Sequence, residues 1–134
     1  MYNYSGDQEC RGFQRIYLNL LVWYKALNPE EVCKMLGSAD QAAVSLDISP
    51  VGISFMSNHD IPLSSELGLK FVVFNSQKVM KPNLFIPIEV KAKVYSSTRY
   101  DNDNYRVGVL FDNISQPLQQ KLASFIRESL PPLV

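Results

Sequence analysis

Two arginines near the N-terminus have the type and spacing needed to hold an anion. They form the segment Arg11-Gly-Phe-Gln-Arg15, an R-x-x-x-R pattern directly before an apolar stretch. Arginine carries a planar fork of N–H donors that grips phosphate oxygens in pairs and stacks on aromatic bases. On an extended segment, residues four apart lie on the same side, so both guanidinium groups can converge on one ligand. The same pattern also fits two solvated arginines beside a strand.

A second polar segment, Asp47-Ile-Ser-Pro-Val-Gly52, is predicted to lie in a tight connection between two strands. The Asp47 carboxylate can accept hydrogen bonds, and the Ser49 hydroxyl can donate or accept them. Gly52 has no Cβ, so the backbone there can approach a ligand closely or adopt a positive φ. These residue types are also the usual ones of an ordinary turn, and that alternative stays open for the segment taken alone.

Alternating apolar residues predict the strands that position these two segments. The alternation begins at Ile16 and continues to Tyr24, which indicates one strand with Ile16, Leu18, Leu20, Val22 and Tyr24 on one face. Further strands are predicted at 43–48, 52–57, 66–75, 84–97 and 105–111, with a polar turn at 101–104. The fold class is therefore mainly β, a six-stranded antiparallel barrel whose closure removes exposed edges.

A short helical insertion is predicted after the first strand, within residues 26–41. Pro29-Glu-Glu31 suits a first helical turn, because proline lacks the N–H that would be unpaired there and acids favour the positive end of the helix dipole. Val32, Met35 and Leu36 then share one side. Gly37 ends the predicted helix.

A second helix is predicted at the C-terminus, with Ser115 as its N-cap and Pro131-Pro132 preventing its continuation. Its apolar residues recur with helical spacing, which predicts that all four are buried: Leu118, Leu122, Phe125 and Ile126. Residues 1–15 are polar and aperiodic, and we expect them to form a flexible N-terminal arm that carries the R-x-x-x-R pattern. Residues 16–134 then form the barrel domain with its C-terminal helix.

Composition restricts the function further. The chain has 134 residues, 46% of them hydrophobic, and its net charge is zero, so one domain without a strongly basic surface for DNA or RNA is expected. Cys10, Cys33 and the single histidine, His59, form no metal-ligating pattern, so neither a metal nor a cofactor is expected. No Ser/His/Asp set or phosphate loop is present in the sequence, which argues against an enzyme. The N-terminus does not resemble a signal peptide and no apolar run reaches about 20 residues, so we expect a cytoplasmic protein without membrane insertion.

The two polar segments together resemble the binding signature of PilZ domains. In that family R-x-x-x-R precedes the first strand, and [D/N]-x-S-x-x-G lies between the second and third strands. Val107-Gly-Val-Leu-Phe111 also resembles the G-V-x-F strand near the end of PilZ domains, and a helix follows it here as well. The resemblance spans roughly residues 11–128 and departs from the family at 26–41, where PilZ domains usually have a shorter connection.

The resemblance implies a bacterial cytoplasmic receptor for the second messenger cyclic di-GMP, acting in processes such as motility or biofilm formation. In PilZ domains the two arginines grip phosphate and guanine, whereas the Asp or Asn and the Ser line the guanine pocket. These roles fall on Arg11, Arg15, Asp47 and Ser49, with Gly52 as a backbone position. The receptor is expected to change conformation when it binds the ligand and to signal to a protein partner of unknown identity.

Two alternative functions remain. The first is a PilZ-fold adaptor that binds proteins without a nucleotide, for example in pilus or motility machinery. The second is a module for single-stranded nucleic acid on an OB-like barrel. Such a module needs a basic track with interleaved aromatic residues, and the zero net charge with scattered Lys and Arg does not support one.

Overall fold

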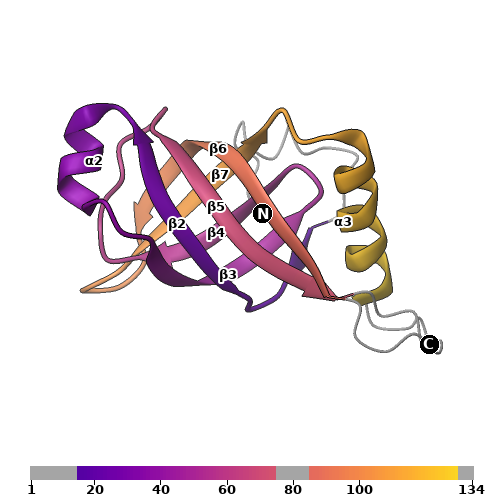
Figure 1. Ribbon diagram of the computed structural model, residues 1–134. Coiled ribbons are helices and arrows are strands. Elements are labelled where there is room, and N and C mark those ends of the chain that lie inside the picture. The colour runs from indigo at the N-terminus through magenta and orange to yellow at the C-terminus, as the bar shows by residue number, and fades with distance from the viewer. Residues whose placement is uncertain (1–14, 75–84, 130–134) are drawn as a thin grey trace.

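The structure is a computed structural model that describes residues 15–74 and 85–129 (Figure 1). The expected flexible arm, with Arg11, therefore lies outside the described residues, except for Arg15. The elements in chain order are β1 (Ile16–Tyr17), β2 (Leu21–Asn28), α2 (Glu30–Leu36), β3 (Gln41–Ser49), β4 (Gly52–Ser57), β5 (Glu66–Phe74), β6 (Phe85–Arg99), β7 (Tyr105–Asp112) and α3 (Gln116–Ser129).

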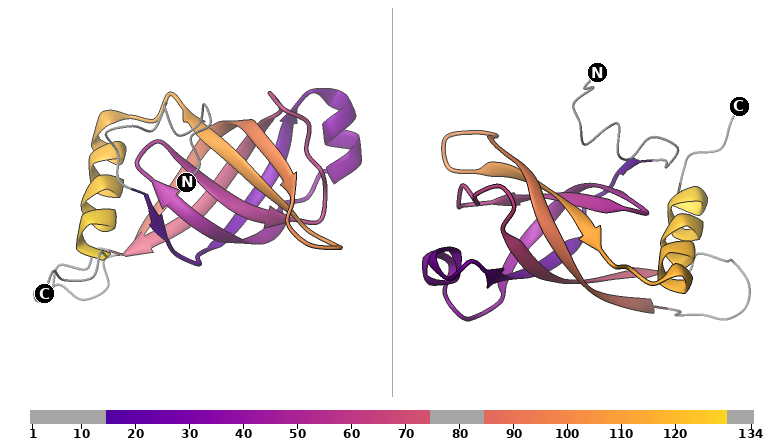
Figure 2. Two further views of the ribbon diagram at one scale, coloured as in Figure 1. Left: turned by 180° about the vertical axis from the view of Figure 1, so that it is seen from behind. Right: turned by 90° about the horizontal axis from the view of Figure 1, so that it is seen from above.

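Six of the strands close into an antiparallel barrel, as the sequence predicts. The order is β3-β2-β5-β6-β7-β4, and β4 pairs with β3 to complete the circle (Figures 1 and 2). Alternate residues of each strand point into the barrel, so that Ile53 and Phe55 of β4 and Val107 and Val109 of β7 are buried in its core. The residues between them, among them Ser54 and Gly108, therefore face outwards.

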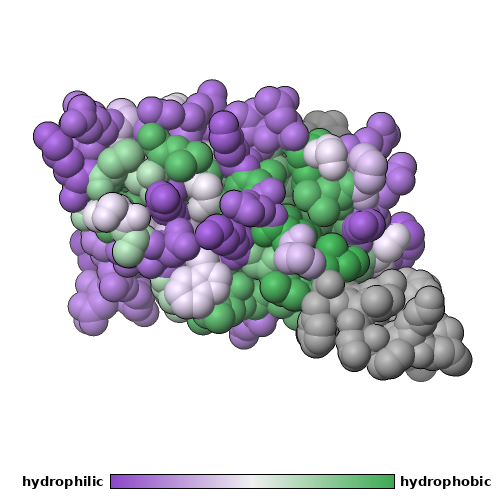
Figure 3. Space-filling view, viewed as in Figure 1, coloured by the Kyte–Doolittle hydropathy of each residue, from purple (hydrophilic) through white to green (hydrophobic). Residues whose placement is uncertain are grey.

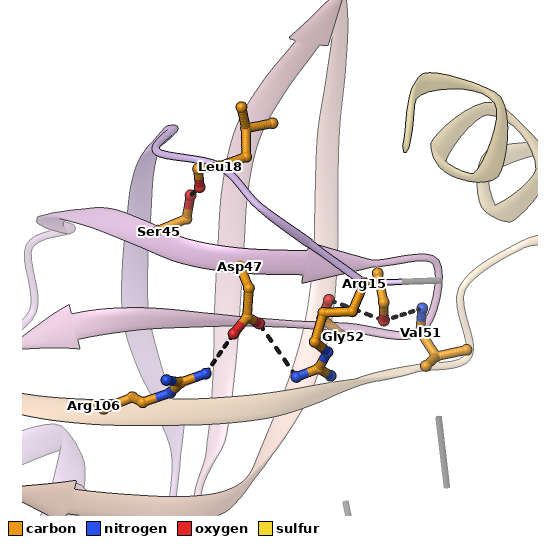
Figure 4. Close-up of polar contacts among 8 residues, drawn as sticks. Arg15, Leu18, Ser45, Asp47, Val51, Gly52 and Arg106 are labelled. Carbon is orange, nitrogen blue, oxygen red and sulfur yellow. Dashed lines mark hydrogen bonds and ion pairs between the residues drawn. The ribbon is translucent and has the colours of Figure 1, made fainter. Parts of the chain in front are cut away.

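The first strand is not continuous, contrary to the prediction. Ile16 pairs with Ile48 and Leu21 pairs with Val44, so five steps along the first segment match four steps along β3. The extra residue breaks the ladder between β1 and β2. The Ser45 hydroxyl fills the break, because it donates to the Leu18 carbonyl oxygen (Figure 4). It also accepts from the Leu20 N–H at 2.7 Å. β2 also continues beyond the predicted end, to Asn28.

The helical insertion is confirmed as α2, which packs against β2 at one end of the barrel (Figure 1). Pro29 lies at the N-cap position rather than in the first turn, and the Gly37 N–H donates to the Cys33 carbonyl oxygen at the other end. Val32 and Leu36 are buried against the barrel. Met35 is 41% exposed, so the prediction that it shares their side was wrong.

The C-terminal helix is confirmed as α3, which covers the opposite end of the barrel and contacts β3 and β5 (Figure 2). The Ser115 hydroxyl accepts from the Leu118 N–H at 3.3 Å, as expected of an N-cap. Leu122, Phe125 and Ile126 are buried, whereas Leu118 is only partly buried, because it belongs to the first turn of the helix and lies at the margin of the core. Within the described ranges, no helix is long and apolar enough to cross a membrane.

Candidate functional site

The polar segment from Asp47 to Gly52 forms the hairpin between β3 and β4. Asp47 and Ser49 belong to β3 itself, and only Pro50 and Val51 form the turn. The observed connection is therefore shorter than the predicted one. The Ser49 hydroxyl accepts from the Val51 N–H at 3.2 Å and lies 3.5 Å from the Gly52 carbonyl oxygen, to which it can donate (Figure 4). Ser49 is buried and holds the turn in shape.

Asp47 lies on the outer face of the barrel. The register of β3 against β4 shifts between Ser45 and Asp47, so that Ile48 enters the core and Asp47 points away from it. Asp47 pairs across the sheet with Tyr17 of β1 and with Ser54 of β4. Its side chain is nevertheless only 1% exposed, since arginines cover it.

Two arginines hold the two carboxylate oxygens of Asp47. The Arg15 Nη1 atom donates to Oδ1 at 3.2 Å, and the Arg106 Nη2 atom donates to Oδ2 (Figure 4). The Arg15 side chain is 11% exposed and the Arg106 side chain is 38% exposed, so Arg106 forms the more accessible side of the cluster. A buried carboxylate requires such partners, because an unpaired charge away from water is costly. The three side chains together carry one net positive charge, which favours an anionic ligand.

Gly52 is required by the packing of β4 against β7. A Cβ atom built on Gly52 would lie 2.4 Å from the Val109 carbonyl oxygen, which is far too close. Gly52 does not have a positive φ, so that alternative from the sequence was wrong. The close approach seen here is to a neighbouring strand, and a contact of Gly52 with a ligand stays a prediction.

The structure brings together most of the residues predicted from the sequence. Arg15 contacts Asp47 directly, and Ser49 and Gly52 lie in the same hairpin. Arg11 lies outside the described residues. All five assignments to a ligand remain predictions.

Arg106 is a site residue that the sequence reasoning missed. It lies in β7 and is 59 residues from Asp47 along the chain. The alternation of Val107 and Val109 could have placed it on the outer face of the barrel. β4 pairs with β3 on one side and with β7 on the other, and this pairing brings Arg106 of β7 close to Asp47 of β3. The sequence alone does not show that pairing.

The chemistry available at the cluster is recognition rather than metal binding. Among the described residues no group of His, Cys, Asp and Glu side chains is suited to hold a metal ion. Guanidinium groups bind phosphates through paired hydrogen bonds, and a carboxylate accepts from the N–H groups of a base. The cluster therefore combines donors for an anion with an acceptor for a base.

The fold and the sequence match known proteins. The PilZ domain family model matches residues 11–128. Among solved structures, the Bacillus subtilis inhibitor of motility MotI (DgrA) is 19% identical, with a TM-score of 0.61 over 88% of this chain and 50% of that chain. The PilZ domain of YcgR from Escherichia coli, with c-di-GMP, is 14% identical, with a TM-score of 0.58 over 89% of this chain and 93% of that one.

A further solved structure, Borreliella burgdorferi PlzA in complex with c-di-GMP, is 13% identical, with a TM-score of 0.53 over 97% of this chain and 58% of that one. The present chain thus spans half the length of the MotI chain and a larger part of the other two. No curated protein matches the sequence. The family match covers most of the chain and agrees with both the barrel topology and the position of the polar hairpin, and the chain therefore belongs to the PilZ domain family.

Proposed function

We propose that this chain is a bacterial cytoplasmic receptor domain for cyclic di-GMP that changes conformation on binding and relays the signal to a protein partner. PilZ domains are receptor or adaptor domains rather than enzymes. The observation that carries the proposal is the buried Asp47 carboxylate, held by Arg15 and Arg106 at the position of the family's binding signature. The structures of the YcgR domain and of PlzA with c-di-GMP add support.

The proposed ligand matches the chemistry of the cluster. Its two phosphates suit the guanidinium groups of Arg11 and Arg15, whose paired donors fit phosphate oxygens. Guanine presents N1–H and N2–H₂ donors, which suit the Asp47 carboxylate, while Ser49 and the Gly52 backbone complete the base pocket.

Binding would change the contacts of Asp47. Both of its oxygens already accept from arginines, so a base that donates to them competes with Arg15 and Arg106. Arg15 directly precedes β1. If the base replaces Asp47 as the partner of Arg15, the position of Arg15 changes, and with it the start of the segment that carries Arg11. This rearrangement is the conformational change that a protein partner would detect.

A nucleotide-independent adaptor is the alternative function, and one surface feature favours a protein contact. On the outer face of the barrel, Leu21 of β2 lies opposite Val44 of β3, and Val72 of β5 lies opposite Pro87 of β6. Leu21, Val72 and Pro87 line one shallow pocket. Leu21 is 56% exposed, and apolar side chains interrupted by charged ones are visible on this face in Figure 3. Exposed apolar surface of this kind suits a protein partner, whether or not a nucleotide controls the contact.

Thermal unfolding with two dinucleotides distinguishes these functions. A ligand that binds the folded state at about 100 times its Kd stabilises it by about 2.7 kcal/mol. We expect cyclic di-GMP to raise the Tm, and cyclic di-AMP to raise it far less, because adenine has an acceptor at N1 where guanine has a donor. An unchanged Tm with both dinucleotides would favour the adaptor, and a rise with oligonucleotides alone would favour the nucleic-acid module.

A further inference from the structure

Ser54 lies beside Asp47 on the outer face of the barrel. The two residues are directly opposite each other in the β3–β4 ladder, and Ser54 is also opposite Gly108 of β7. Both sequence neighbours of Ser54, Ile53 and Phe55, are buried in the core, so its side chain points to the same face as Asp47. Nothing in the sequence distinguishes this serine from those around it.

The Ser54 hydroxyl is buried without a hydrogen-bond partner. The residue is 2% exposed, and in the described part of the chain its Oγ atom makes no hydrogen bond. The other buried serines are all bonded: Ser45, Ser49, Ser57 and Ser65. Buried hydroxyl groups are nearly always paired in folded proteins, and an unpaired one at a binding site points to a missing partner.

The surroundings of Ser54 limit what that partner can be. A Cβ atom on Gly108 would lie 2.6 Å from the Ser96 Oγ atom and 3.1 Å from the Tyr95 Cζ atom, so these side chains cover Gly108 on one side of Ser54. Asp47 lies on the other side. Opposite residues in an antiparallel pair have Cβ atoms about 4.5–5.5 Å apart. One flat group that contacts Asp47 can therefore also reach the Ser54 hydroxyl.

The edge of guanine has the matching pattern of donors and an acceptor. Its N1–H and N2–H₂ groups donate, and the neighbouring O6 atom accepts. An ionised carboxylate only accepts, whereas a hydroxyl can donate. Asp47 and Ser54 thus offer an acceptor next to a donor, which is the complement of this edge. Adenine carries an amino group in place of O6 and an acceptor in place of N1–H, so it would leave Asp47 without the N1–H donor.

We propose that the Ser54 hydroxyl donates to O6 of the guanine whose N1–H and N2–H₂ groups bind Asp47, and that Arg106 leaves Oδ2 of Asp47 as this base enters. The inference rests on the proposed function. Arg106 is the partner that is displaced, because its side chain is 38% exposed against 11% for Arg15 and can therefore move into solvent with less loss of packing. Ser54 is then a residue that determines the specificity for guanine.

Calorimetric titration of cyclic di-GMP into the Ser54→Ala variant tests the inference. Loss of one hydrogen bond is expected to weaken binding about fivefold to tenfold. The Tm without ligand should stay the same or rise, because the substitution removes a buried unpaired hydroxyl. Ser57→Ala is a matched control on the same strand. Its hydroxyl bonds to Tyr24 at 2.9 Å and to the His59 N–H at 2.9 Å, so the control should lower the Tm and leave the affinity unchanged.

A dinucleotide with hypoxanthine in place of guanine adds a second readout, because hypoxanthine keeps O6 and lacks the N2 amino group. Ser54→Ala should weaken its binding by the same factor as that of cyclic di-GMP. If Ser54→Ala binds like the unmodified chain, or lowers the Tm as Ser57→Ala does, Ser54 is not a ligand contact, although the receptor proposal stands. If the unmodified chain binds no cyclic di-GMP, the proposed function fails and this inference fails with it.

Discussion

Two arginines from distant parts of the chain cover the Asp47 carboxylate and keep it buried. Arg15 precedes the first strand and Arg106 lies in the last one, and each donates to a different oxygen. The pair of arginines fixes the orientation of the carboxylate before any ligand is present. A base that donates to this carboxylate replaces one of these bonds, so the loss of an arginine contact offsets part of the energy of the new hydrogen bond.

The first prediction concerns Arg15 and the free energy of unfolding. Among the residues that the structure describes, Arg15→Ala leaves the buried Asp47 carboxylate with Arg106 as its partner, and we expect a loss of about 1–3 kcal/mol. Chemical denaturation with urea measures this loss. Lys34→Ala is the control, since Lys34 pairs with Glu30 at 3.9 Å while both side chains are exposed, and it should change stability by no more than about 0.5 kcal/mol. Equal stability of Arg15→Ala and the unmodified chain would mean that the ion pair does not support the fold.

The second prediction concerns the same residue and the ligand. An arginine–phosphate contact contributes about 1.5–3 kcal/mol, so Arg15→Ala should weaken binding of cyclic di-GMP roughly tenfold to a hundredfold or more. Arg15→Lys keeps the charge without the planar fork, and it should bind with intermediate affinity. The folded fraction of each variant, measured by circular dichroism, separates lost binding from lost structure. Affinity that is unaffected by Arg15→Ala would remove Arg15 from the proposed site.

Part of this cluster is readable from the sequence. The resemblance to PilZ domains implied that Arg15 and Asp47 contribute to one site, and the structure places the two side chains in contact. Their exposure was not predictable, because an arginine next to a polar arm normally faces water. The Arg15 side chain is only 11% exposed, so its substitution affects stability as well as binding. Arg106 was missed because its position depends on strand pairing over long sequence separations.

The β3–β4 hairpin is the element that positions the cluster, and its geometry depends on Gly52. The third prediction is that Gly52→Ala destabilises the fold by about 1–3 kcal/mol, because the new Cβ collides with the Val109 carbonyl oxygen and separates β4 from β7. Gly68→Ala is a matched control in β5, where the new Cβ would lie 3.7 Å from Leu27, an ordinary contact distance. Thermal unfolding of both variants gives the comparison. A Tm of Gly52→Ala equal to that of Gly68→Ala would contradict the role assigned to Gly52.

Strands were predictable from alternation, but interruptions within them were not. The prediction for β4 agrees with the observed bounds, Gly52–Ser57. The break between β1 and β2 arises because the Ser45 side chain replaces a backbone partner, which apolar alternation does not reveal. In the same way, helical spacing identified α2 and α3 but not the exposure of Met35 or Leu118. The exposure of these two side chains depends on which part of each helix packs against the barrel.

The whole molecule is a barrel with one helix at each end (Figure 1). The turn of the β3–β4 hairpin reaches toward the end covered by α3, whereas Asp47 and Arg106 lie on the outer wall of the barrel (Figure 4). The Phe111 N–H donates to the Val51 carbonyl oxygen at 2.8 Å, which ties the hairpin to the strand that leads into α3. A partner that contacts α3 could therefore respond to a change at the hairpin. The barrel itself was predictable because successive strands joined by turns form a meandering antiparallel sheet, and closure of such a sheet removes its exposed edges.

The fourth prediction concerns the attachment of α3 to the barrel. Leu122 is fully buried, and Leu122→Ala should lower the free energy of unfolding by about 2–5 kcal/mol, because it removes apolar contacts and leaves a cavity. Lys121→Ala changes the adjacent exposed position and should be nearly neutral. Urea denaturation measures both. A neutral Leu122→Ala would show that α3 contributes little to the core.

Calorimetric titration of cyclic di-GMP at low salt, into the unmodified chain and into Asp47→Ala, measures whether Asp47, held by Arg15 and Arg106, is the acceptor for the guanine base. We expect saturable binding to the unmodified chain and an affinity at least about tenfold lower for Asp47→Ala, because a hydrogen bond to a charged group contributes about 1.5–3 kcal/mol. No saturable binding to the unmodified chain, or equal affinity for both proteins, would contradict this role of Asp47.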